Sequence, residues 1–242
     1  MLFIDCREGL SGDMLLAALL GLVETQRRRD IIDLIEEGAR RRDIALDVLE
    51  IQEGYESGLG VSSRTKDVQW SERSYQDAHS FVDELSAELG SSSQLPRKIL
   101  GLIFDAEAEA HGLPATQVHL HEIGRPEALL NIACLGLVHS ALVAAGVGEI
   151  VASPVTTGKG IVVVSHGAVR VPAPAAKILL RGLTHTQGSD PGERATPSGI
   201  AAVKAMISRQ SEDVPAGLKA KSIGFGTRRF GGRLGRTTAF LV

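Results

Sequence analysis

The sequence predicts an α+β protein, with helices interleaved with strands and hairpins around a mixed sheet and one domain covering residues 1–242. Apolar residues recur at helical spacing in some segments and alternate in others, and the two kinds of segment follow each other along the chain. Several strand-like segments are also neighbours across glycine-rich turns, which favours hairpins over a purely parallel sheet. Residues 90–95, which include Gly-Ser-Ser-Ser, are the best candidate for an internal linker.

The first half of the chain is expected to contain a strand at 2–6, helices at 14–23 and 29–42, strands at 46–52 and 61–69, and helices at 76–89 and 96–111. Apolar residues on one face, such as Ile31, Leu34 and Ile35, predict the second helix. Pro96 is typical of a first helical turn, and Gly112 is typical of a helix end.

The second half is expected to contain a long helix at 126–146, strands at 149–156, 161–164 and 169–171, helices at 175–180 and 197–208, and strands at 220–226 and 237–242. Pro126 and Pro197 suit the first turns of their helices. Pro172 and Pro174 end the third of these strands.

Composition excludes several classes of protein. A net charge of -3 gives no overall nucleic-acid or membrane signature, and the apolar stretches are too short to span a bilayer. The two cysteines, Cys6 and Cys134, do not make a disulfide framework. We therefore expect a cytoplasmic protein that binds a small molecule, and its oligomeric state is left open.

His119-Leu-His121 is the strongest indication of chemistry, because alternate side chains of a strand project to the same side. The two imidazoles are then candidate ligands for one metal ion, whereas Glu122 points the other way. Two donors make half a site, so other residues must complete it. The alternative is that one histidine caps a turn and the other packs in the core.

Two loops lead from small residues into helix N-termini, where unpaired N–H groups bind anions. The first contains Ser11, Gly12 and Asp13, and the second contains Thr196, Ser198 and Gly199. The hydroxyls at either loop are equally explained as helix caps. Asp5 and Cys6 lie at a strand end, where sheet proteins often carry functional groups, although Cys6 also suits a core position.

Further candidates are His166, in a turn between strands, and a C-terminal cationic segment that includes Arg228 and Arg229. No acidic residue follows Asp213, so this segment suits a phosphorylated small molecule better than duplex DNA. A turn histidine that bonds a nearby carbonyl, and a solvated basic surface, are the alternatives.

Taken in order, the motifs resemble the LarC family of nickel insertion proteins, which complete the nickel-pincer cofactor. The matching segments are Asp5-Cys6 with Gly9-Leu-Ser-Gly-Asp-Met14, Ala106-Glu-Ala-Glu-Ala-His111-Gly112, Val118-His-Leu-His-Glu-Ile-Gly124, Ser153-Pro154 with Gly158-Lys-Gly160, Ser165-His-Gly167, Val171-Pro-Ala-Pro-Ala175, Ala195-Thr-Pro-Ser-Gly199 and Ile223-Gly-Phe-Gly-Thr-Arg228.

The resemblance implies CTP-dependent insertion of Ni²⁺ into a pyridinium bis-thiocarboxylic acid mononucleotide, with Mg²⁺ or Mn²⁺ accompanying the CTP. The product has one nickel–carbon and two nickel–sulfur bonds. His119 and His121 would then hold nickel, and Asp5, Asp13, Glu122 and His166 would orient ligands or transfer protons. The remaining candidates would contact the phosphorylated substrate: Ser11, Gly12, Thr196, Ser198, Gly199, Arg228 and Arg229.

Three departures from the family pattern qualify this expectation. The family usually has acidic residues where this chain has Glu127 and Asn131, and Asn131 supplies no charge to a cation. The stretch 69–93 contains only His79 in place of a histidine-rich loop, which disfavours nickel storage. Longer members continue into a C-terminal domain, so either a separate subunit is expected to supply it or this chain lacks the complete activity. The alternatives are a non-catalytic nickel-binding or scaffold subunit and a relative acting on another phosphorylated heterocycle.

Overall fold

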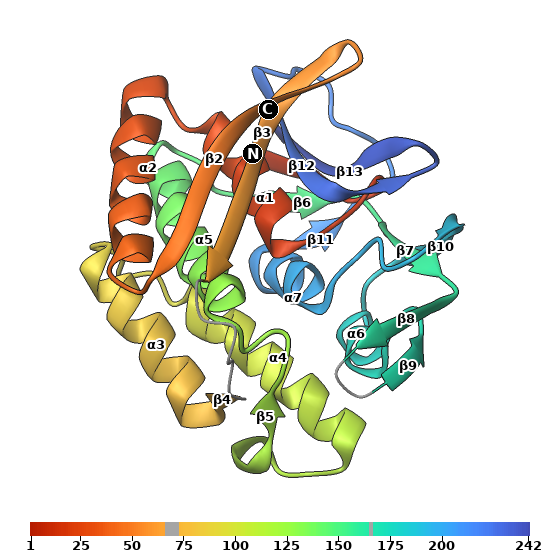
Figure 1. The fold of residues 1–242 in the computed structure, drawn as a ribbon. Coiled ribbons are helices and arrows are strands. Elements are labelled where there is room, and N and C mark those ends of the chain that lie inside the picture. The colour runs from red at the N-terminus through yellow and green to blue at the C-terminus, as the bar shows by residue number, and fades with distance from the viewer. Residues whose placement is uncertain (66–72, 165–166) are drawn as a thin grey trace.

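The computed structural model describes residues 1–65, 73–164 and 167–242, and its centre is a mixed seven-stranded sheet (Figure 1). The strands are, in spatial order, β11 (Arg209–Gln210), β6 (Ile150–Ala152), β1 (Leu2–Asp5), β13 (Arg233–Leu241), β12 (Ala220–Phe230), β3 (Glu56–Thr65) and β2 (Ile44–Glu53). The pairs β2–β3 and β12–β13 are antiparallel hairpins, whereas β1 pairs with β6 in parallel. The predicted α+β class with a mixed sheet is confirmed.

The helices of the described residues are α1 (Gly12–Leu22), α2 (Thr25–Arg40), α3 (Tyr75–Glu88), α4 (Leu95–His111), α5 (Pro126–Ala144), α6 (Pro174–Leu179) and α7 (Pro197–Met206), with a 3₁₀ turn η1 (Ala115–Gln117). Three two-stranded pairs lie outside the main sheet: β4 (Arg73–Ser74) with β5 (His119–Leu120), β7 (Val155–Lys159) with β10 (His185–Pro191), and β8 (Ile161–Val164) with β9 (Gly167–Arg170).

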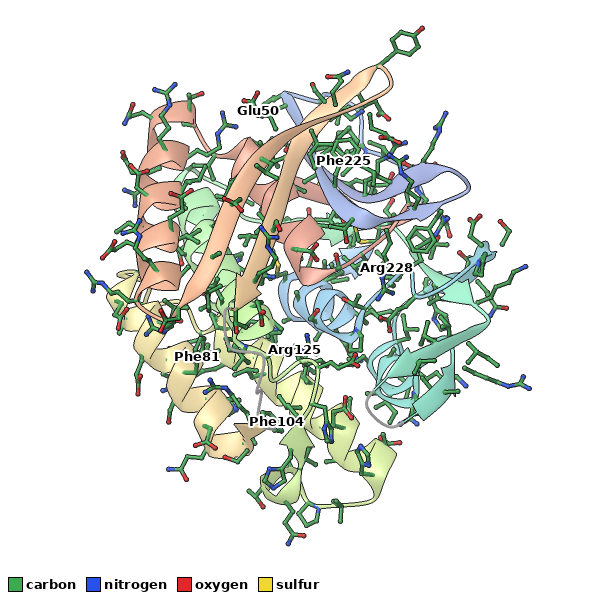
Figure 2. The ribbon with its side chains drawn as sticks, in the orientation of Figure 1. Glu50, Phe81, Phe104, Arg125, Phe225 and Arg228 are labelled. Carbon is green, nitrogen blue, oxygen red and sulfur yellow. The ribbon has the colours of Figure 1, made fainter. Side chains whose placement is uncertain are left out.

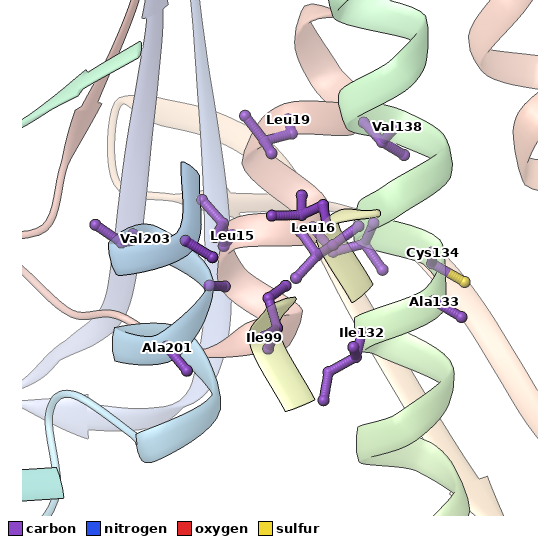
Figure 3. Close-up of a cluster of buried hydrophobic side chains, with 14 of the residues drawn as sticks. Leu15, Leu16, Leu19, Ile99, Ile132, Ala133, Cys134, Val138, Ala201 and Val203 are labelled. Atoms are coloured by element: carbon purple, nitrogen blue, oxygen red, sulfur yellow. The ribbon is translucent and has the colours of Figure 1, made fainter. Parts of the chain in front are cut away.

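Helix α1 lies directly on the sheet and forms the middle layer of the fold. Nearly all its side chains are buried, and it contacts β3, β12 and β13 on one side and α5 and α7 on the other. Gly224 of β12 permits this approach, because a Cβ atom there would lie 1.9 Å from the Met14 carbonyl oxygen. Leu16 and Leu19 of α1 meet Ile132 and Val138 of α5 in the principal core (Figure 3). The first turn of α1 therefore lies close against β12 of the sheet.

Helix α5 is long and apolar enough to cross a membrane by length and composition, contrary to the expectation that no segment would be. In the fold, 56% of its most apolar window is buried, and the helix contacts α1, α3 and α4. Its hydrophobicity is explained by its position at the centre of the helical layer.

Most expected elements occur within a few residues of their predicted bounds, and one expected strand is corrected. The strand expected at 149–156 divides at Pro154 into β6 and β7, which belong to different sheets. The hydroxyl of Ser153 accepts the Cys6 N–H at 2.8 Å where the two strands separate. Segment 90–94, within the predicted linker, is a short connection between α3 and α4, which pack on the same core. Residues 66–69 of the strand expected at 61–69 lie outside the described residues.

Candidate functional site

Four adjoining hollows lie where the starts of α1, α5 and α7 face β12 and β5. The helix-start hollow, of about 300 Å³, is lined by Ser11, Asp13, Glu127, Asn131, Thr196 and Ser198, among others. A histidine hollow of about 190 Å³ and an arginine hollow of about 290 Å³ share Glu122 with it. A fourth hollow, of about 130 Å³, shares Ser11 and Thr196 with the first and Arg228 with the arginine hollow. Because their walls are shared, we treat them as one cleft.

The two loops predicted to bind anions meet at this cleft. The Ser11 hydroxyl caps α1 by accepting the Met14 N–H at 3.4 Å, and the Thr196 hydroxyl caps α7 by accepting the Gly199 N–H at 3.3 Å. The predicted alternative, that these hydroxyls cap their helices, therefore describes what they do within the fold. The hydroxyl of Ser198 lies 3.1 Å from that of Thr196.

Backbone contacts hold these two loops together. The Thr196 N–H donates to the Leu10 carbonyl at 2.8 Å, and the Leu10 N–H donates to the Arg194 carbonyl at 3.0 Å. A Cβ atom on Gly199 would lie 2.8 Å from Leu10 and Ser11 backbone atoms, so only glycine leaves room for this approach. The absence of a side chain at Gly199 thus allows the loops at Ser11 and Thr196, almost 190 residues apart in sequence, to lie side by side.

The two histidines line the same hollow, although the strand that was expected to present them is shorter. Strand β5 covers only His119 and Leu120, and it pairs with Arg73 and Ser74 of β4. The chain bends at His121, so the alternation of a strand ends there. Glu122 consequently lines the histidine hollow too, and the expectation that it points away is wrong.

The histidine hollow also contains Glu107 and His111, which face each other on α4 at 3.6 Å between Oε2 and Nε2. Apolar side chains, including Ile123, Val169 and Pro174, form much of the remaining wall. Within the described residues, no group of three or more histidine, cysteine, aspartate or glutamate side chains converges as a closed metal site. A metal ion held by His119 and His121 would thus need further ligands from a bound substrate.

Glu193 is one of the cleft residues that the sequence did not predict. It lies between β10 and the start of α7 and lines the histidine hollow, the arginine hollow and the fourth hollow. Burial raises the pKa of its carboxyl, Arg228 opposes this effect, and the Glu122 carboxylate adds to it. The sequence signal was weak, because it was one glutamate beside the Thr196–Gly199 motif.

Two arginines face the arginine hollow from opposite elements: Arg125 at the start of α5 and Arg228 on β12 (both labelled in Figure 2). Arg229 does not join them. Its guanidinium donates to Glu53 Oε1 at 2.7 Å, since neighbouring residues of a strand face opposite ways. The structure therefore separates the two arginines that were predicted to act together.

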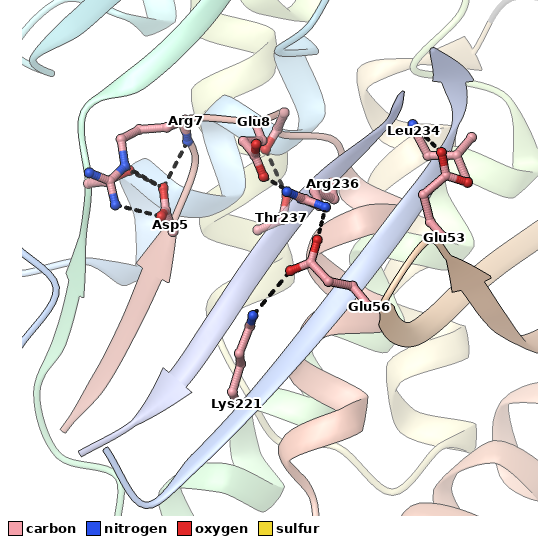
Figure 4. Close-up of polar contacts among 11 residues, drawn as sticks. Asp5, Arg7, Glu8, Glu53, Glu56, Lys221, Leu234, Arg236 and Thr237 are labelled. Carbon is pink, nitrogen blue, oxygen red and sulfur yellow. Dashed lines mark hydrogen bonds and ion pairs between the residues drawn. The ribbon is translucent and has the colours of Figure 1, made fainter. Parts of the chain in front are cut away.

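Asp5 lies outside the lining of the four hollows. Its carboxylate accepts the Arg7 guanidinium at 2.6 and 2.8 Å and the Ser153 hydroxyl at 3.2 Å (Figure 4). Burial raises the pKa of this carboxyl, but the bonds and charge of Arg7, with Ser153, hold it below its usual value. This arrangement indicates a structural ion pair. His166, the other candidate for proton transfer near a strand end, lies outside the described residues.

Glu127 and Asn131 lie one turn apart on α5 and both line the helix-start hollow. Glu127 Oε1 accepts the Thr65 N–H at 2.7 Å. Glu127 Oε2 and Asn131 Oδ1 are buried and have no hydrogen-bond partner among the described residues. Buried polar atoms are normally paired, so these two oxygens still have the capacity to accept hydrogen bonds.

The fold and the cleft define an α+β protein with a polar cleft at the starts of three helices, and comparison with known proteins gives its family. The family model described as "Nickel insertion protein" matches residues 2–236, so the chain belongs to that family. The resemblance predicted from the motifs is confirmed.

Among its relatives, the "Putative nickel insertion protein" of Geotalea daltonii is 31% identical over 241 residues, covering 93% of this chain and 56% of the relative. The pyridinium-3,5-bisthiocarboxylic acid mononucleotide nickel insertion protein of Desulfitobacterium hafniense (strain DSM 10664 / DCB-2) is 32% identical over 234 residues, covering 93% and 53%. Its namesake in Staphylococcus epidermidis is 28% identical over 244 residues, covering 95% and 56%. The chain thus spans about half the length of these relatives. No solved structure matches it.

Proposed function

We propose that this chain binds Ni²⁺ and a pyridinium-3,5-bisthiocarboxylic acid mononucleotide in the cleft and takes part in inserting the metal into that substrate. The observation that supports it best is the junction of the histidine hollow, which includes His119 and His121, with the arginine hollow. Imidazole holds divalent nickel, and arginine recognises phosphate. The names of the longer relatives supply the same pair of ligands.

The substrate would lie with its ring in the histidine hollow and its phosphate between Arg125 and Arg228. The adjoining helix-start hollow is lined by Gly12 and by the hydroxyl-bearing residues Ser11, Thr196 and Ser198. Gly199 supports this hollow by letting the two loops approach closely. His119 and His121 would supply two nitrogen donors to nickel, and the two thiocarboxylates of the substrate would add the soft donors that the protein does not supply.

The family resemblance implies that nickel forms a bond to a ring carbon. The carbon–hydrogen bond then breaks, its electron pair forms the carbon–nickel bond, and the proton must pass to a base. Glu193 and Glu122 are the proposed acceptors, because both line the histidine hollow and burial raises the pKa of the Glu193 carboxyl. Asp13 stays a candidate for orienting ligands from the neighbouring hollow.

We assign the CTP-dependent step, with its Mg²⁺ or Mn²⁺, to the half of the longer relatives that this chain does not span. In the cleft, Arg125 and Arg228 suffice for one phosphate monoester, while Arg194 is engaged by Asp190 at 2.5 Å. On this proposal the complete reaction also needs that other half. If the isolated chain turned over CTP and formed the product unaided, this division of labour would be wrong.

The nickel assignment is tested by titration calorimetry with Ni²⁺. We expect the double variant His119→Ala/His121→Ala to lose nickel binding, because it removes both nitrogen donors. His185→Ala is the matched control, since His185 is exposed on β10 outside the cleft. Equal nickel affinity in the wild type and the double variant would refute the assignment.

A further inference from the structure

The helix-start hollow contains two buried oxygen atoms that the nickel and phosphate assignments do not use. Glu127 Oε2 and Asn131 Oδ1 accept no hydrogen bond from the described residues. The Thr65 N–H binds the other oxygen of Glu127 at 2.7 Å and so fixes how the carboxylate is turned. Because the two residues are four apart on α5, their side chains leave the same face of the helix.

The chemistry of these atoms restricts what they can bind. An anion would be repelled by the Glu127 carboxylate. One carboxylate and one neutral amide do not by themselves make a metal site built from protein ligands, and no group of three or more histidine, cysteine, aspartate or glutamate side chains gathers in the described parts of the chain. A ligand with two neighbouring hydroxyls would donate to both oxygens, and a carboxylate accepts such bonds strongly.

We propose that Glu127 and Asn131 bind the two ribose hydroxyls of the mononucleotide, so that the cleft selects ribonucleotides. This inference rests on the proposed function. The ribose of a mononucleotide is bonded to both its ring and its phosphate, and the helix-start hollow adjoins both of the hollows proposed for those groups. It shares Glu122 with the histidine hollow and Arg125 with the arginine hollow.

The experiment uses titration calorimetry on the 242-residue chain. The probes are pyridinium-3-carboxylic acid mononucleotide and its 2′,3′-dideoxy counterpart, which keeps the ring and the phosphate. The variants are Glu127→Gln, whose amide oxygen still accepts the Thr65 N–H, and Asn131→Asp, which keeps an acceptor oxygen at that position. Glu149→Gln is the matched control, because Glu149 pairs with Arg209 outside the cleft.

We expect Glu127→Gln to weaken binding of the ribose compound by roughly 10- to 100-fold, which is typical for loss of a hydrogen bond to a charged group. Binding of the dideoxy compound should not change, and Asn131→Asp should keep the preference for ribose. Thermal unfolding of each variant verifies that it folds. If Glu127→Gln itself does not fold, wild-type discrimination and the Asn131→Asp variant decide the matter.

Three results would overturn the inference. Equal affinity of the wild type for the two probes would remove the ribose contact while leaving the proposed function intact. Equal weakening of both probes by Glu127→Gln would show a general effect of charge. A lower Ni²⁺ affinity in Glu127→Gln, measured without nucleotide, would make Glu127 a metal ligand. If the wild type bound neither probe, the proposed function would fail first, and this inference would fail with it.

Discussion

Replacing Gly199 by alanine tests whether the two loops of the cleft depend on one close backbone approach. The added methyl group would lie 2.8 Å from the Leu10 carbonyl carbon and oxygen and from the Ser11 Cα atom. Ordinary contact begins at 3.4 Å, so the loops must separate by about 0.6 Å. All three atoms are backbone, and no flexible side chain can move aside instead.

Overpacking of this kind costs about 1–3 kcal/mol, and alanine returns up to about 1 kcal/mol through its better helix propensity. We therefore expect a net loss of about 1–2 kcal/mol in the free energy of unfolding. For a chain of this size, that loss lowers Tm by roughly 2–8 °C. Because Ser11 and Thr196 would also move apart, affinity for the pyridinium mononucleotide should fall.

The assays are urea denaturation, thermal unfolding and calorimetric titration of the mononucleotide. Gly101→Ala is the matched control, because Gly101 lies inside α4 and an added Cβ meets no atom within 4 Å. It should gain about 0.5–1 kcal/mol and leave ligand affinity unchanged. A Gly199→Ala variant as stable as Gly101→Ala would refute the packing argument.

Three further outcomes are expected. Arg228→Ala should weaken mononucleotide binding about tenfold or more, whereas Arg229→Ala should not, and equal effects in calorimetry would contradict the separation of the two arginines. The pKa of Glu193 is raised in the fold, so its protonated form stabilises the protein at low pH, and this contribution is lost as pH rises through that raised pKa. The variant Glu193→Gln should therefore be more stable than the wild type at neutral pH and equally stable below the usual glutamate pKa. Urea denaturation at a series of pH values measures this difference. Burial raises the pKa of the Cys6 and Cys134 thiols, so neither should react with a thiol reagent until guanidinium unfolds the chain, and labelling of the native protein would contradict their burial.

Local patterns predicted most of the helices, because capping, proline and apolar periodicity act within a few residues. The start of α4 at Leu95–Pro96 and its end at Gly112 follow these signals. The division of the strand at Pro154 and the presence of β10 were not predicted, since both depend on partners far along the chain. Strand β10 is also largely exposed and lacks the apolar alternation that would have indicated it.

The candidate site was predicted in part for the same reason. The loops at Ser11 and Thr196 were recognisable as helix starts, but their contact across Gly199 is a property of the fold. Glu193 and Arg125 gave no pattern in the sequence and become candidates only through burial and the shared hollows. Arg229 was assigned with Arg228 because they are neighbours in sequence, and the direction of alternate side chains separates them.

The pairing of the first strand with the last has a consequence for how the chain acquires its structure. Strand β1 lies inside the sheet between β6 and β13, with Leu2 opposite Leu241 and Phe3 packed on Phe240. During synthesis, β1 must therefore wait for β13, which follows it by more than two hundred residues, before its hydrogen bonds on that side can form. Such long-range pairing slows folding, and until it forms, the exposed strand Leu2–Asp5 would be prone to aggregate through its unpaired backbone groups. The order of synthesis thus makes β1, an inner strand of the sheet, one of the last to be completed.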